Sequence, residues 1–483
     1  MSSLPVAIAI PVDEGPWPRA VLHCDMDSFF VAVHRLHAPE DQGVPLVVGG
    51  SADGRGVVAS ASYEARRFGV RSAMPTARAL RLCPGLKVVS ANWSHIRACS
   101  KQVMEALAAF GPLEAMSVDE AYVDVTDALA RFIADGRGPS AEEGPLAGAA
   151  SRTRRPNEGG RPAAPTADRA GAMRGSRSSV PPRDDPAWIA TAVAMGALPP
   201  RAVRSASLGR GAQKRPDRPP ASSHMPTKRP ESDARSRGEG PAPLPSPLAR
   251  AFAASVREAV VAATGLPASV GLAPNKGVAK VASDFEKPEG VTVVPPGTEA
   301  AFLAPMPVRA IHGIGPRTAE RLGRLGIETC AQLAAADPVQ LAATFGQHAE
   351  GLSRRALGRD DRPVRPERGP AKSISAERTF RRDVSDQAAL LAKVDELAEE
   401  IAGVLAKRKL EARTVIVKIR WDDFTTYTRQ RTVEVPVSDA GELREIARLL
   451  WLEHWPPGKP VRLVGVGTAK LSDREEGQLK LWG

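Results

Sequence analysis

Two adjacent acidic residues, Asp119 and Glu120, stand inside the segment EAMSVDEAYVDV (114–125). Residues 121–125 alternate small apolar side chains with Tyr and Asp, which predicts a β-strand that begins directly after the acids. Neighbouring side chains of a regular strand point to opposite faces, and burying a carboxylate without a partner is costly. A bend at this point would let both acids face one cation site.

A second acidic site lies in HCDMDSFF (23–30), where Asp25 and Asp27 are two residues apart near the end of an apolar strand. Carboxylates beside backbone carbonyls suit a hard cation such as Mg²⁺, which binds oxygen ligands. The alternative is that Asp27 or Ser28 caps the helix expected to begin at about Ser28. We interpret Asp25 as a metal ligand and favour capping for Asp27.

The two acidic segments together indicate a specific chemistry. If Asp119 and Glu120 converge on Asp25, three carboxylates can hold two cations about 4 Å apart, the arrangement used for in-line phosphoryl or nucleotidyl transfer. Either segment alone would be weak evidence, because Asp-Glu before a strand is common.

Basic and phenolic side chains gather in SASYEARRFGVRSAMP (60–75), which contains Tyr63, Arg66, Arg67 and Arg71. Guanidinium groups present a fork of donors that matches phosphate oxygens. A solvated basic helix face explains these residues equally well.

The elements that must position these residues alternate between strands and helices. The segment 19–36 reads as a strand entering a helix, 94–111 and 247–265 as amphipathic helices, and 267–274 as a strand. From about residue 295 to 358 the pattern is helical with short loops, and the last part reads as strand, helix, hairpin and strand. The chain is therefore expected to be α+β and multidomain.

The composition changes sharply between residues 135 and 246. This window holds 18 of the 44 prolines, 19 Lys+Arg and 11 Asp+Glu, and so carries most of the net charge of +11. Such a segment cannot bury enough apolar surface to offset ordering, which predicts a mostly disordered basic insertion with one short helix around Trp188. The pI of about 9.7 is therefore poor evidence that the folded part binds nucleic acid.

The N-terminal sequence, the hydropathy and the cysteines together indicate the cellular compartment. No run of about 20 apolar residues is present, and the N-terminus lacks the basic start of a signal peptide. The four cysteines form no CxxC pair and are expected to be small buried side chains, not disulfides or zinc ligands. A cytoplasmic protein with no membrane contact is expected.

Six motifs in one order carry a family resemblance: HCDMDSFFVAV, YEARRFGVRSAMP, SVDEAYVDVT, SVGLAPNKGVAKVASDFEKPEG, IHGIGPRTAERL and KSISAERTF. Together they resemble the Y-family translesion DNA polymerases, and among them the bacterial DNA polymerase IV group. The resemblance covers roughly residues 19–134 and 247–483, and an ordered set of this kind is very specific.

The resemblance implies a right-hand polymerase with palm, fingers, helical thumb and an α+β little-finger domain, the insertion lying in the palm. The implied boundaries are an N-terminal extension at 1–18, palm at 19–36, 92–134 and 247–296, fingers at 37–91, the disordered insertion at 135–246, thumb at 297–365, a linker at 366–372, little finger at 373–473 and a C-terminal tail at 474–483.

The resemblance also implies roles for the acids. Asp25 and Asp119 would be ligands of two Mg²⁺ ions, assisted by the Met26 carbonyl. Glu120 would be the third carboxylate and the catalytic residue beside the primer 3′-hydroxyl.

Four further residues match positions that contact the incoming nucleotide in the family. Tyr63, Arg66 and Lys280 would bind the triphosphate, although Lys280 taken alone reads as a solvated helix lysine. Phe30 would be the steric gate, a ring that excludes a ribose 2′-hydroxyl, whereas Phe29 is expected in the core.

Two peripheral motifs imply DNA and protein partners. IHGIGPRTAERLGRLGI (311–327) reads as a helix–hairpin–helix in which Gly313 and Gly315 let backbone N–H groups approach a DNA phosphate; a plain structural turn is the alternative. The tail GQLKLWG (477–483) resembles a sliding-clamp-binding peptide, and packing of its Trp on the little finger is the alternative. The clamp-binding residues would be Gln478, Leu479, Leu481 and Trp482.

The function expected from this set is low-fidelity, template-directed DNA synthesis past damaged bases by a monomer, with primer–template DNA and deoxynucleoside triphosphates as substrates. One rival is a non-catalytic DNA- and clamp-binding scaffold of the same fold, which would have lost the acids that this chain retains. Another is a helix–hairpin–helix nuclease, which would not need the motif at 63–75.

Overall fold

The computed structural model describes residues 17–135, 247–367 and 369–474. The expected extension at 1–18, the insertion at 135–246 with its Trp188 helix, and the tail at 474–483 lie almost entirely outside the described residues. The described chain forms two compact units, of which one comprises residues 297–359 and the other the remainder. Within this part of the chain, no helix combines the length and apolarity needed to cross a bilayer.

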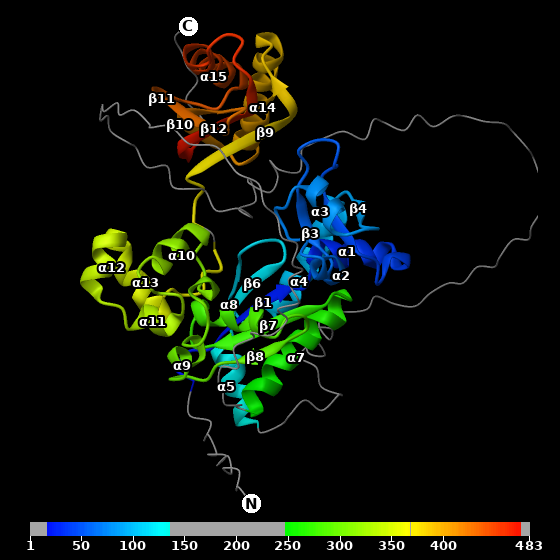
Figure 1. The fold of residues 1–483 in the computed structure, drawn as a ribbon, viewed down its shortest axis with the longest axis vertical. Helices are drawn as coiled ribbons and strands as arrows, with labels where there is room; N and C mark the ends of the chain where they lie inside the picture. The colour runs from blue at the N-terminus through cyan, green and yellow to red at the C-terminus, as the bar shows by residue number, and fades with distance from the viewer. Residues whose placement is uncertain (1–16, 136–246, 368, 475–483) are drawn as a thin grey trace, which may run out of the picture. The chain divides into compact units, whose positions relative to one another are not determined.

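A five-stranded sheet organises the larger unit, and its central strand leads into the HCDMDSFF segment (Figure 1). Its middle strand is antiparallel to both neighbours, whereas the last two strands are parallel. In order across the sheet, the strands are β5 (Leu113–Ala115), β6 (Glu120–Asp124), β1 (Val21–Met26), β7 (Ala268–Ala273) and β8 (Val291–Val293).

Three helices bury one face of this sheet. Leu22, Cys24 and Met26 alternate along β1 and join one apolar core with residues of these helices. The helices are α4 (Trp93–Ala108), α5 (Thr126–Ala134) and α7 (Pro247–Thr264), of which α7 packs on β7 and β8.

The opposite face receives the polar residues of β1, His23 and Asp25, and is covered by α8 (Lys276–Phe285). Gly271 on β7 allows this helix to approach closely. A Cβ at Gly271 would lie 2.2 Å from the Ala279 carbonyl oxygen and 2.3 Å from the Ser283 nitrogen, so a side chain would push α8 away.

A three-stranded sheet, β3–β2–β4, forms a smaller layer with its own core. The N-terminus of α2 is capped there by Ser62, whose hydroxyl accepts a hydrogen bond from the Ala65 nitrogen. The elements are α1 (Phe29–His37), η1 (Pro39–Asp41), β2 (Leu46–Gly49), β3 (Val58–Ala61), α2 (Tyr63–Arg67), α3 (Thr76–Leu82) and β4 (Lys87–Val89).

The unit at 297–359 is entirely helical, as the sequence pattern predicts. Leu322, Leu333 and Leu341 are fully buried within it. Its helices are α9 (Glu299–Leu303), η3 (Val308–Ala310), α10 (Pro316–Gly323), α11 (Cys330–Ala334), α12 (Pro338–Phe345), η4 (Gly346–His348) and α13 (Ala349–Ala356).

The C-terminal elements form an antiparallel sheet in the order β11–β10–β12–β9, with two helices packed together on it. The sequence pattern predicted only the first of these helices. The second, α15 (Ala440–His454), buries Leu443, Ala447, Leu450 and Trp451, an i, i+4, i+7, i+8 spacing that could have revealed it. The other elements are β9 (Ser373–Val384), α14 (Gln387–Lys407), β10 (Leu410–Trp421), β11 (Thr426–Val437) and β12 (Val461–Asp473).

All four cysteines are buried free thiols, which confirms the expectation that they are small interior side chains.

Candidate active site

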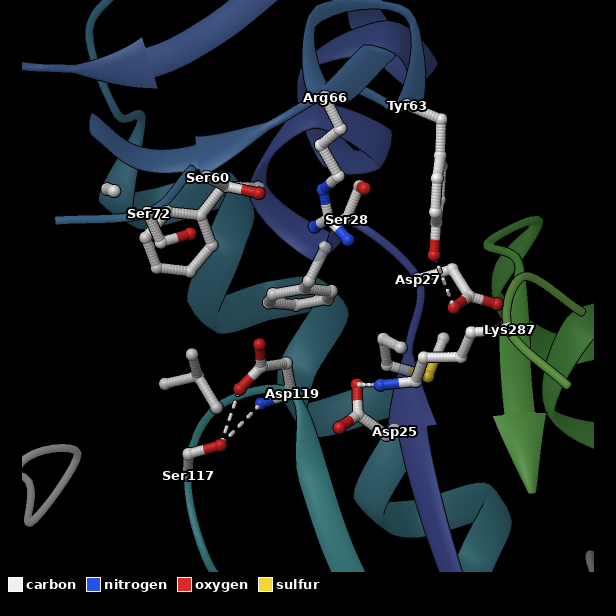
Figure 2. A pocket seen from close by; sticks show the side chains of 15 residues that line it. Asp25, Asp27, Ser28, Ser60, Tyr63, Arg66, Ser72, Ser117, Asp119 and Lys287 are labelled. Atoms are coloured by element: carbon white, nitrogen blue, oxygen red, sulfur yellow. Dashed lines mark hydrogen bonds and ion pairs between the residues drawn. The ribbon is translucent and has the colours of Figure 1, made fainter. Parts of the chain in front are cut away.

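A pocket opens where β1 passes into α1, facing α2 and the segment before β6 (Figure 2). Asp25 and Asp119 line it on one side, Tyr63 and Arg66 on another, and Lys287 reaches it from the turn after α8. The remaining lining residues are Met26, Asp27, Ser28, Phe29, Phe30, Ala59, Ser60, Ser72, Ser117 and Val118.

Asp25 and Asp119 are brought to this pocket by two neighbouring strands. Asp25 is near the end of β1, and Asp119 directly precedes β6, where its carbonyl accepts a hydrogen bond from the Met26 nitrogen at 2.9 Å. The Ser117 hydroxyl donates to the Asp119 carboxylate. Burial raises the pKa of Asp119 to about 6, and the charges of Asp25 and Glu120 add to this effect against the hydrogen bond from Ser117.

Lys287 forms an ion pair with Asp25. Its Nζ lies 2.8 Å from Asp25 Oδ1 and 2.7 Å from Asp284 Oδ1. Burial opposes the charge of this ammonium, but the two carboxylates outweigh burial and raise its pKa above the ordinary value. Sequence reasoning missed Lys287, although it begins the KPEG turn at the end of one of the family motifs.

Glu120 does not line the pocket. It is the first residue of β6, opposite Asp25 in the antiparallel register, and its carboxylate pairs with Lys280 of α8. His23 Nε2 lies 3.5 Å from Glu120 Oε2, a long contact compared with that of Lys280. Burial opposes ionisation, but His23 and Lys280 together lower the pKa of Glu120 to about 2.

The adjacent acids therefore separate in the structure. Glu120 shares the sheet face of Asp25, where Lys280 of α8 holds its carboxylate, whereas Asp119, directly before the strand, lines the pocket. Among the described residues, no group of three or more His, Cys, Asp or Glu is arranged to hold a metal ion. Of the three carboxylates expected to form one cluster, Asp25 and Asp119 line the pocket and Glu120 does not.

Asp27 is almost completely buried, with 3% of its surface exposed, and it does not cap α1. The N-cap is Ser28, in a left-handed conformation with φ 48° and no side-chain capping bond; its hydroxyl donates instead to the Ala61 carbonyl. The capping interpretation is therefore wrong for Asp27, whereas Ser28 occupies the N-cap position without making a capping bond. The carboxylate of Asp27 is engaged by Tyr63, Ser269 and Glu289 instead.

Tyr63 and Arg66 lie one helical turn apart on α2. The Arg66 guanidinium stacks over the Tyr63 ring at 4.7 Å, and its Nε donates to the Ala61 carbonyl at 3.0 Å. Burial and the charge of Asp27 raise the pKa of the Tyr63 phenol to about 12. Arg67 and Arg71, in contrast, are exposed and do not line the pocket.

The two phenylalanines at the start of α1 occupy different environments. Phe29 is 2% exposed and belongs to the core, whereas Phe30 is half-buried and lines the pocket. The edge of the Phe30 ring meets Trp93, with centroids 5.6 Å apart and planes at 77°. The indole therefore packs directly against the Phe30 ring.

In the helical unit, Gly313 and Gly315 form the turn before α10. Gly313 has φ 91°, which favours glycine, and a Cβ there would lie 2.8 Å from Arg355 Nη1. Gly315 is the N-cap of α10, and no atom would lie within 4 Å of a Cβ there. The clamp-binding candidates Gln478, Leu479, Leu481 and Trp482 lie outside the described residues.

Comparison with known proteins identifies the chain's relatives. The impB/mucB/samB family matches residues 24–284, its helix–hairpin–helix motif residues 296–327, and its C-terminal domain residues 371–481. A protein named DNA polymerase IV from Alkalilimnicola ehrlichii is 32% identical, over 94% of this chain and 95% of its own length. Another from Methanoculleus marisnigri is 33% identical, over 94% of each chain. A solved structure, the Y-family DNA polymerase chimera Dbh-Dpo4(243-245)-Dbh, has the same fold, with a TM-score of 0.63 at 20% identity, covering 94% of this chain and all of that one.

Because the family model spans more than half of the chain and relatives above 30% identity match nearly its full length, the chain belongs to the impB/mucB/samB family, the family of the Y-family polymerases named DNA polymerase IV.

Proposed function

We propose that the protein is a template-directed DNA polymerase of low fidelity that extends primers past damaged template bases by two-magnesium nucleotidyl transfer. The observation that carries this proposal is the pocket itself, where two carboxylates face a phenol, a guanidinium and an ammonium. In the terms of the family, the five-stranded sheet is the palm, the three-stranded sheet the fingers, 297–359 the core of the thumb, and 373–473 the little finger.

The residues present fit magnesium. Asp25 and Asp119 offer hard oxygen ligands, and the raised pKa of Asp119 reports carboxylate charge that the protein alone compensates poorly. We assign these two residues, with the Met26 carbonyl, as ligands and Glu120 as the third carboxylate. When bound, the two ions lower the pKa of the primer 3′-hydroxyl and neutralise the triphosphate and leaving pyrophosphate.

Glu120 has to change partners to act in this way. Its carboxylate is held by Lys280, and its low pKa keeps it ionised throughout the neutral range. We propose that Glu120 leaves Lys280 when it takes its place beside the primer end. That step would release Lys280 from its ion pair, so the role at the triphosphate that the resemblance implies for Lys280 stays a prediction.

The cationic side of the pocket suits a triphosphate. Arg66 presents a fork of N–H donors, Tyr63 a hydroxyl, and Lys287 a point charge, all lining the same space. We assign these three residues to the triphosphate, Phe30 to the sugar, and the backbone of Gly313 and Gly315 to a DNA phosphate.

Primer extension tests this function directly. The wild-type protein with Mg²⁺ is expected to add the nucleotide complementary to each template base, and Asp25→Asn to slow this by at least about 100-fold. The matched control is Asp124→Asn, at the far end of β6, where the carboxylate oxygen only accepts hydrogen bonds from Thr126. Undiminished extension by Asp25→Asn would contradict the mechanism, and DNA binding without extension by the wild type would favour the scaffold.

We further propose a sliding clamp as a partner of the tail at 474–483, in a protein that acts as a cytoplasmic monomer. The composition of residues 478–482, polar then apolar with a Trp, supports a peptide that inserts into an apolar pocket. Deleting 478–483 is expected to abolish the stimulation of synthesis by the clamp and to leave clamp-free synthesis unchanged. An equal loss of both activities would contradict clamp binding.

A further inference from the structure

Asp27 is a buried carboxylate that lines the same pocket as Asp25. Its Oδ1 accepts a hydrogen bond from the Tyr63 hydroxyl at 3.0 Å. Its Oδ2 accepts one from the Ser269 hydroxyl at 2.8 Å and one from the Glu289 backbone nitrogen at 2.8 Å. Burying a carboxylate is unfavourable unless hydrogen bonds compensate it, so these three donors explain how the charge is kept there.

Each of the three donors belongs to a different segment of the chain. Tyr63 begins α2, the helix that carries Arg66 one turn later. Glu289 lies two residues after Lys287 in the turn that follows α8. Ser269 lies on β7, beside β1, and is completely buried.

Ser269 extends the support of the Lys287 turn. Its hydroxyl accepts a hydrogen bond from the Gly290 nitrogen at 3.2 Å while it donates to Asp27. Two successive backbone N–H groups, those of Glu289 and Gly290, are therefore held by Asp27 and Ser269. Glu289 itself has φ 57°, an unfavourable conformation for a residue other than glycine, so the turn needs such external support.

We propose that Asp27 is a positioning residue that fixes Tyr63 and the Lys287 turn relative to β1, and that it is not a metal ligand. The two acids of the Asp-Met-Asp motif thus have different roles. Asp25 is a ligand of the cation, and Asp27 positions the side chains that bind the nucleotide. Positioning of this kind lowers the cost of ordering the triphosphate contacts when the nucleotide binds. The role rests on the proposed function, because it assumes that Tyr63 and Lys287 bind a triphosphate.

Conservative and disruptive variants of Asp27 separate positioning from metal binding. Asp27→Asn can keep an acceptor toward Ser269 and Glu289 and donate an N–H to the Tyr63 oxygen, so the network survives with Tyr63 as the acceptor. Asp27→Ala leaves all three donors without their partner. We expect Asp27→Ala to raise the KM for the nucleotide by about tenfold or more, and Asp27→Asn to keep it within about threefold of the wild type.

Ser269→Ala tests the same network from outside the pocket. It removes the hydroxyl between Asp27 and Gly290, and Ser269 does not line the pocket. We expect a severalfold rise in nucleotide KM with little change in kcat. The matched control is Ser255→Ala on α7, whose hydroxyl only donates to the Phe252 carbonyl of its own helix.

To test the positioning role of Asp27, three quantities are measured for each variant. These are KM and kcat for single-nucleotide primer extension, equilibrium binding of a non-hydrolysable deoxynucleoside triphosphate to the protein–primer–template complex, and the rise in Tm on adding Mg²⁺ alone. Weaker nucleotide binding with an intact magnesium shift in Asp27→Ala, restored in Asp27→Asn, supports the proposal. A lost magnesium shift in Asp27→Asn, or a fall in its kcat like that of Asp25→Asn, would overturn it.

The design distinguishes this proposal from the function on which it rests. If the wild type fails to extend any primer, the polymerase assignment fails, and the binding measurement still tests whether Asp27 positions the nucleotide site. If the wild type extends primers and Asp27→Ala binds the nucleotide as tightly as the wild type does, only the positioning role is wrong.

Discussion

Asp119→Asn is expected to abolish primer extension and at the same time to make the metal-free protein more stable. In the wild type, the Asp119 carboxylate shares the pocket with Asp25, and burial together with neighbouring negative charge raises its pKa to about 6 from an ordinary 3.8. Asparagine keeps the shape and can still accept the hydrogen bond from Ser117, but it carries no charge. The variant thus removes a metal ligand, and it also removes a buried negative charge that destabilises the folded protein.

The raised pKa of Asp119 determines how the stability of the folded protein changes with pH. A carboxyl group whose pKa is higher in the folded than in the unfolded state favours folding below pH 3.8, and this contribution is lost as the pH rises through about 6. At pH 7.5 the full penalty is present. Two pKa units correspond to about 3 kcal/mol, which we reduce to about 1–2 kcal/mol because the residue is not fully shielded from solvent.

Thermal unfolding in EDTA measures the stability part of this prediction. We expect Asp119→Asn to exceed the wild type in Tm by a few degrees at pH 7.5 and by less at pH 5. Adding Mg²⁺ should raise the Tm of the wild type, because a ligand of the folded state stabilises it, and should raise that of the variant less. Asp124→Asn is the control and should respond to magnesium like the wild type; a less stable Asp119→Asn protein in EDTA would contradict the argument.

The strands around the site could be predicted from the sequence because their signals are local. Alternation of apolar and polar residues in 121–125 predicted β6, and the buried residues Ala121 and Val123 do face the core. The same alternation implies that Asp119 and Glu120 point to different faces. The sequence predicts a bend that brings them together, but Glu120 pairs regularly with Asp25 as the first residue of β6, and of the two adjacent acids Asp119 lines the pocket.

The partners of the charged residues could not be predicted, because they depend on how distant segments pack. Lys280 meets Glu120 because α8 lies directly on the sheet, and that approach depends on the missing side chain of Gly271. Asp27 receives its hydrogen bonds from residues 36, 242 and 262 positions later in the chain. Periodicity carries no information about such contacts, so the sequence favours a capping role for Asp27, which needs only local partners.

Phe30→Ala is expected to raise the incorporation of ribonucleotides relative to deoxyribonucleotides. Phe30 lines the same pocket as Asp25 and Tyr63, and its contact with Trp93 restrains the ring. A 2′-hydroxyl forced against a well-supported ring costs roughly 1–3 kcal/mol, the usual penalty for overpacking. Truncation to alanine removes that penalty, which corresponds to a loss of discrimination of about 10- to 100-fold.

The quantity to measure is kcat/KM for a deoxynucleotide divided by kcat/KM for the matching ribonucleotide, opposite the same template base. The control is Phe29→Leu, because Phe29 precedes Phe30 on α1 but is buried in the core, and a leucine there perturbs packing without widening the sugar site. Phe29→Leu should keep the ratio of the wild type even if it lowers the Tm. An unchanged ratio in Phe30→Ala, with primer extension retained, would show that another side chain excludes the ribose.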